Sequence, residues 1–118
     1  MSELLTLDGL SAPMRALRLL AVDFGHLPAP AVDMSGIFAE RLYLSLHTSD
    51  LTGVSALAAF EMWRDALGID PHTVTIAERS GGRTCVLRAE TLFGGAEIVL
   101  RAYADTPAGP DSEPGGAA

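Results

Sequence analysis

Two Gly-Gly pairs constrain the fold of this chain more than any other feature. Gly81-Gly82 and Gly94-Gly95 each separate two segments in which apolar side chains occur at alternating positions. Two adjacent glycines in this setting are typical of two-residue hairpin loops, because the favoured turns need a positive φ that other residues rarely adopt. The sequence therefore predicts a meander of three antiparallel strands, covering residues 73–79, 83–93 and 96–104.

Two-residue loops also fix which residues stand opposite one another in these strands. The rows that we expect to face the helices are Val74, Ala89 and Leu100, and then Ile76, Leu87 and Ala102. The opposite side of the sheet is called the outer face. Its predicted rows are Thr75, Arg88 and Arg101, and then Ala77, Val86 and Tyr103, with Glu90, Val99 and Glu97 nearby.

Two amphipathic helices are predicted ahead of the meander. The first covers residues 11–24, with Ser11 as its N-cap and Pro13 in its first turn, and Gly25 and Pro28 follow its end. The second covers residues 54–67 and is ended by Gly68. The apolar stripes consist of Met14, Leu17, Leu20, Ala21 and Phe24 in the first helix, and of Ala56, Phe60, Trp63 and Leu67 in the second.

Two further strands are expected between the helices. Residues 31–37 show a weaker pattern, whereas in residues 41–47 leucines alternate regularly with other side chains. The predicted order is α-β-β-α-β-β-β. This order is typical of a two-layer α+β sandwich, in which both helices cover one face of an antiparallel sheet. We expect a single domain over residues 1–105 and a flexible tail over residues 106–118, which hold three prolines and three glycines.

Length and charge narrow the possible classes of protein. Because a domain has about 150 residues on average, a chain of 118 residues is long enough for only one. The net charge is −7 and all eight basic residues are arginines, so nonspecific nucleic-acid binding is disfavoured. No apolar run approaches the roughly 18 residues of a membrane span. An acid at position 3 stands where a signal peptide needs positive charge, so we expect a cytoplasmic protein.

One segment resembles a stretch found in short actinobacterial proteins. It reads Ala-Phe-Glu-Met-Trp-Arg-Asp-Ala-Leu-Gly-Ile-Asp-Pro over residues 59–71, followed by Val74. The order of hairpin, helix and three-stranded meander is also similar, over residues 17–105. The resemblance implies a cytoplasmic single domain and carries over no catalytic residues.

The side chains that could act in catalysis or bind a metal form no recognised motif. None of the three histidines (His26, His47 and His72) lies in a spacing such as HxH or HExxH. His47 precedes Asp50 closely enough for a general-base pair, but no nucleophile motif accompanies them. Cys85 alternates with core residues and is interpreted as a small buried apolar side chain. We therefore predict no catalytic residue, no metal site and no cofactor.

The outer face is the candidate binding surface. Arg88 directly opposite Arg101 is unfavourable unless Glu90, Glu97 or an external anion compensates the two charges. An apolar excess, including Leu92, is typical of interaction surfaces, although one solvated face is ordinary for an antiparallel sheet. The residues predicted to bind a partner are Arg88, Arg101, Tyr103, Val86, Val99, Glu90 and Glu97.

Three function classes follow from these patterns. The leading hypothesis is a non-enzymatic protein-binding module that uses the outer face for an acidic protein partner or for a homodimer. A homodimer could alternatively pair through the edge of the last strand, residues 96–104. The second hypothesis is an acidic inhibitor or immunity-type protein, which would occlude a basic site on an effector with carboxylates such as Glu61 and Asp65. A small enzyme ranks third, because two helices on one sheet leave little concavity.

Overall fold

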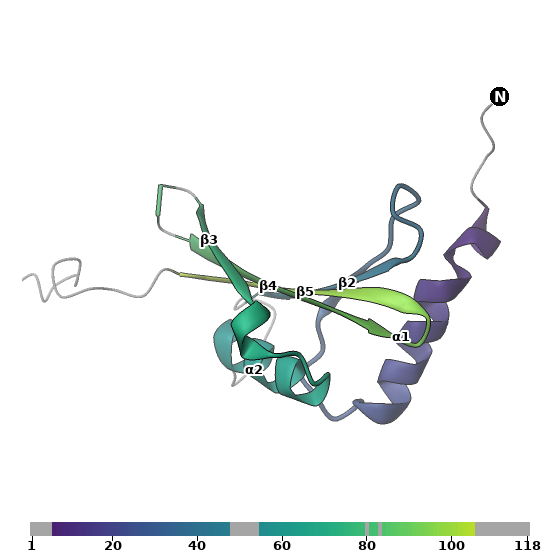
Figure 1. The fold of residues 1–118 in the computed structure, drawn as a ribbon, viewed down its shortest axis with the longest axis horizontal. Coiled ribbons are helices and arrows are strands. Elements are labelled where there is room, and N and C mark those ends of the chain that lie inside the picture. Colours follow the sequence, from purple (N-terminus) through teal and green to yellow (C-terminus); the bar gives the residue numbers. More distant parts are fainter. Residues whose placement is uncertain (1–5, 48–54, 80, 83, 106–118) are drawn as a thin grey trace, which may run out of the picture.

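The computed structural model describes residues 6–47, 55–79, 81–82 and 84–105, and has two layers, a five-stranded sheet with both helices on one face (Figure 1). The predicted α+β class and the order α-β-β-α-β-β-β are confirmed. The predicted tail at 106–118 lies outside the described residues. The helices are α1 (Ser11–Asp23) and α2 (Ala56–Ala66), and the strands are β1 (Ala31–Asp33), β2 (Arg41–His47), β3 (Thr75–Arg79), β4 (Thr84–Phe93) and β5 (Ala96–Asp105).

The sheet is mixed, with the order β1-β2-β5-β4-β3. The β3–β4 and β4–β5 pairs are antiparallel in the predicted register, with Arg88 opposite both Thr75 and Arg101. The prediction of a wholly antiparallel sheet is wrong at one position, because β2 runs parallel to β5. The predicted edge pairing through the last strand is also wrong, since β5 is the central strand. Its apolar run Ile98-Val99-Leu100, buried on both faces, is typical of such a strand.

Helix α1 begins one residue after the 3-10 helix Leu7–Leu10. Ser11 is therefore the first residue of α1 and not its N-cap, and no side chain caps this end. The helix buries Pro13, Ala16 and Leu20, whereas the predicted stripe member Ala21 is exposed. The stripe is rotated because Ala16 packs against the Gly94-Gly95 turn.

Helix α2 begins two residues later than predicted, at Ala56, and is followed by Gly68 as predicted. The Ser55 hydroxyl accepts a hydrogen bond from the backbone N–H of Ala58 at 3.1 Å, and Gly68 follows the helix with a φ of 71°. Phe60 and Trp63 are buried, and the Trp63 indole Nε1 donates to the backbone oxygen of Pro28 at 2.8 Å. This bond ties α2 to the segment that joins α1 to β1.

Two strands are shorter than predicted. β1 ends at Asp33, because residues 34–40 turn before β2 begins. β3 begins at Thr75, because Asp70 caps the 3-10 helix Pro71–Thr73. As an edge strand β3 lies beyond the helices, so Ile76 is 69% exposed although its register places it on the helix-facing side.

The core lies between the helices and the central strands. Its fully buried members come from α1, α2, β2 and β5, so the two layers are joined mainly through the middle of the sheet. The largest of them are Leu20, Leu42, Leu44, Leu46, Phe60, Ile98 and Leu100.

Replacing Gly94 by Ala should destabilise the fold more than replacing Gly81 by Ala. Both residues have a φ near that of a left-handed turn, 62° and 69°, which costs a residue with a Cβ about 1 kcal/mol. A Cβ at Gly94 would additionally lie 3.1 Å from the Ala16 Cα, whereas one at Gly81 meets nothing within 4 Å. Urea unfolding should therefore place G94A about 1 kcal/mol below G81A. Equal midpoints would show that the turn does not pack tightly on α1.

Candidate partner-binding face

The outer face of the sheet carries no helix in the described part of the chain (Figure 1). The register of β4 and β5 places all the predicted partner-binding residues on this face. Its residues are Arg41, Tyr43, Ser45 and His47 from β2, Glu97, Val99, Arg101 and Tyr103 from β5, and Val86, Arg88, Glu90 and Leu92 from β4.

The parallel pairing of β2 with β5 adds side chains that sequence analysis did not assign to the site. Arg41 stands beside Glu97, Tyr43 beside Val99 and Ser45 beside Arg101. The alternation of residues 41–47 already indicated a strand with a polar side. The alternation does not indicate which strand pairs with residues 41–47, because parallel neighbours are distant in sequence.

Two of the three arginines that β2, β4 and β5 place on this face have carboxylate partners; Arg79 of β3 lies on the same face by register. Arg88 Nε donates to Glu90 Oε2 at 2.8 Å, which confirms the predicted role of Glu90. Glu97 accepts from Arg41 Nε at 2.6 Å, so the prediction that Glu97 would compensate Arg88 or Arg101 is wrong. Hydrogen bonds to Tyr43 and Glu97 raise the pKa of Arg41.

Arg101 has no carboxylate partner among the described residues. Its guanidinium carbon lies 4.8 Å from the centre of the Tyr43 ring, and Nη2 donates to the Ser45 hydroxyl at a long 3.3 Å. The Nε atom is buried and finds no acceptor in the described part. Arg101 is thus held in place by an aromatic ring and a weak hydrogen bond, with its charge not compensated there.

The apolar residues of the outer face are less accessible than expected. Val86 and Val99 are only 7% and 0% exposed, so the expectation that they offer free apolar area is wrong. Val99 lies between Tyr43 of β2 and Glu90 of β4, and Val86 lies between Ala77 of β3 and Tyr103 of β5. Tyr103 is half-buried and stacks on the His47 ring, with centroids 4.5 Å apart. Leu92 remains 81% exposed.

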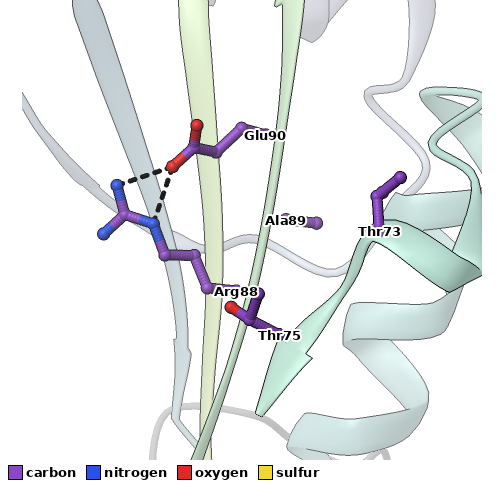
Figure 2. A pocket seen from close by; sticks show the side chains of 5 residues that line it. All are labelled: Thr73, Thr75, Arg88, Ala89 and Glu90. Carbon is purple, nitrogen blue, oxygen red and sulfur yellow. Dashed lines mark hydrogen bonds and ion pairs between the residues drawn. The ribbon is translucent and has the colours of Figure 1, made fainter. Parts of the chain in front are cut away.

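A pocket of about 380 Å³ adjoins the Arg88–Glu90 pair. It lies beside Thr75, the first residue of β3, and beyond this residue β4 has no β3 neighbour. Figure 2 shows the two charged side chains pointing the same way from β4, while Ala89 points the opposite way, toward Thr73. The pocket offers hydroxyl groups of Thr73 and Thr75 beside an ion pair. It therefore extends the polar part of the outer face toward β3.

The histidines and the cysteine, the other candidates for catalysis or metal binding, lie apart from one another. His26 is exposed and His72 contacts Asp70, 3.1 Å away. Asp50, the proposed partner of His47, lies outside the described residues. Cys85 is a buried free thiol. Within the described residues no group of three or more metal-binding side chains gathers.

Acid should weaken the 3-10 helix that precedes β3. The Asp70 carboxylate accepts the backbone N–H of His72 at 2.9 Å, which lowers the pKa of Asp70 below its ordinary value of 3.8. A lowered pKa stabilises the folded state above pH 3.8 and loses that contribution as the pH falls through the folded value. Wild type should therefore be more stable than D70N at about pH 7, and the difference should shrink as the pH falls below 3.8. A difference that persists in acid would contradict this account.

The carboxylates proposed for an inhibitor are not equally free. Arg64 donates two hydrogen bonds to Glu61, at 2.7 and 2.8 Å, and these lower the pKa of Glu61. The same arginine donates to the backbone oxygen of Ile69 at 2.6 Å. Arg64 thus engages Glu61 and the end of α2, which leaves Asp65 as the acid of the proposed pair that has no ion pair among the described residues; both acids are exposed.

No protein-family model matches this chain, and no curated protein matches it significantly. Neither described helix has the length and apolar character needed to cross a membrane.

Proposed function

We propose that the chain is a non-enzymatic cytoplasmic binding module, whose outer face takes a carboxylate-bearing segment of a partner protein through Arg101. The observation that carries the proposal is the state of this arginine. Its charge has no carboxylate partner among the described residues, and its buried Nε has no acceptor there. An Asp or Glu side chain of a partner would compensate the charge, because carboxylates form strong charge-assisted hydrogen bonds with guanidinium N–H groups.

The position of Arg101 supports recognition of an acidic segment. The Tyr43 ring orients the guanidinium, and the Ser45 hydroxyl is a weak competitor at 3.3 Å. A carboxylate that reaches Nη2 would replace this bond with a charge-assisted one. Arg88, directly opposite Arg101, adds positive potential at the same row. Tyr and Arg are also the residue types that contribute most at protein interfaces.

Charge balance favours a different protein over a second copy. Glu90 and Glu97 are already paired with Arg88 and Arg41. Two outer faces brought together by a two-fold axis would therefore add a second uncompensated Arg101, while Glu90 and Glu97 remain engaged in their own ion pairs. A homodimer that compensates Arg101 with Glu90 or Glu97 of the second copy would have to break the existing ion pairs. An acidic segment from another protein needs no such exchange.

The net charge of −7 does not prevent this interaction. At about 0.15 M salt the Debye length is roughly 8 Å, so distant acids on the rest of the surface are largely screened. The contact with Arg101 is made at hydrogen-bond distance and is screened much less. We therefore expect binding to persist at physiological ionic strength.

The test uses a labelled hexaglutamate peptide and fluorescence anisotropy at about 0.15 M salt. Wild type should bind the peptide, and R101M should bind it about tenfold more weakly or worse, because Met keeps the stem and removes the fork. R18M is the matched control: Arg18 is an exposed arginine of α1, and its loss changes the net charge equally. Equal affinities of R101M and R18M would contradict the proposal, as would concentration-dependent dimerisation that R101M abolishes.

A further inference from the structure

A second site lies on the helix side of the sheet, away from the outer face. It is a pocket of about 190 Å³ between the C-terminal half of α1, the segment that leads to β1, and α2. All its lining residues are apolar or glycine, and the large ones include Leu17, Phe24, Leu27, Val32, Leu44 and Trp63. Val32 is 43% exposed, so the pocket opens to solvent.

The walls of this pocket are held in place without a ligand. Pro28 and Pro30 restrict the backbone of the connecting segment, and the Trp63 indole is bonded to the Pro28 oxygen at 2.8 Å. The Phe24 ring stands edge-on to Trp63, with centroids 6.3 Å apart, and contacts Phe93 at 5.9 Å. A preformed pocket lets a ligand bind without the cost of ordering its walls.

We propose that this pocket binds a small uncharged molecule built on a single apolar ring. The volume sets the size: a cavity of roughly 150 Å³ lined by apolar side chains accommodates benzene, whereas drug-sized ligands need about 300 Å³ or more. The lining sets the polarity. The Trp63 N–H already has its acceptor, so nothing in the wall compensates a charged or strongly hydrogen-bonding group.

The only tryptophan of the chain lines the pocket and reports its occupancy directly. Titration with bromobenzene, whose heavy atom quenches indole fluorescence on contact, should give a saturable loss of Trp63 emission. The anionic analogue 4-bromobenzoate should give only weak, non-saturating quenching, because the pocket cannot solvate its charge. Quenching by bromobenzene that never saturates would overturn the proposal.

Pocket-filling variants test the location. A21F and A29F each place a ring into the pocket from opposite walls, at exposed positions that do not belong to the core. Each should weaken bromobenzene binding about tenfold or more. V22F adds the same ring one residue along α1, outside the lining, and should bind like wild type. R101M should also bind bromobenzene normally, which separates this site from the outer face. Saturable binding unchanged in both A21F and A29F would overturn the assignment.

Discussion

Replacing Phe60 by Ala should cost about 3–5 kcal/mol of unfolding free energy and leave the domain close to unfolded. Phe60 is 1% exposed and lies in the core layer that α2 builds against the sheet. Removing its ring loses the transfer free energy of the buried atoms and leaves a cavity that neighbouring strands cannot fill. Urea or thermal unfolding, followed by far-UV circular dichroism, measures the loss.

Leu57 is the matched control for Phe60. It lies on the same helix, is 37% exposed, and its replacement by Ala should cost about 1 kcal/mol or less. Comparable losses for F60A and L57A would mean that α2 is not packed on the sheet through the face described here.

Replacing Arg101 by Met should make the domain about 1 kcal/mol more stable while it abolishes binding of acidic segments. A buried N–H without an acceptor costs about 1–3 kcal/mol, and the substitution also removes the like-charge pair with Arg88. The interactions lost are smaller: a 3.3 Å bond to Ser45 and a contact with the Tyr43 ring, the latter worth about 0.5–1 kcal/mol. The flexible Met side chain keeps the packing over Tyr43.

R88M separates this effect from a general benefit of removing charge. Arg88 is paired with Glu90 on a partly exposed surface, so R88M should leave stability unchanged or slightly lower. Guanidinium chloride screens charges, so urea denaturation is the appropriate measurement. If R101M were no more stable than R88M, the N–H groups of Arg101 would have acceptors in the folded protein, contrary to this prediction.

The meander was predictable from sequence because its signals are local. Gly81-Gly82 and Gly94-Gly95 have the positive φ values that hairpin loops need, and these loops carried the register of β3, β4 and β5 with them. The opposition of Arg88 and Arg101 therefore follows from the position of the Gly94-Gly95 loop alone. The same holds for the end of α2 at Gly68, where the chemistry that stops the helix involves only neighbouring residues.

The composition of the candidate site was only partly predictable, because β2 joins the sheet through a non-local parallel pairing. Nothing near residues 41–47 specifies that Tyr43 and Ser45 will flank Arg101. The same pairing covers Val99 and redirects Glu97 to Arg41. The sequence thus indicated which strands carry the arginines, but not which arginine would keep an uncompensated charge.

The most direct test of the binding account is an NMR titration of the isotopically labelled protein with unlabelled hexaglutamate. We predict that the largest shifts occur at the Arg101 side-chain Nε–H and at the backbone amides of Ser45 and Arg101, the groups around the Arg101 guanidinium. We also predict that these shifts disappear in R101M and persist in R18M. Shifts centred on α1 or α2, or equal shifts in R101M, would contradict the binding account.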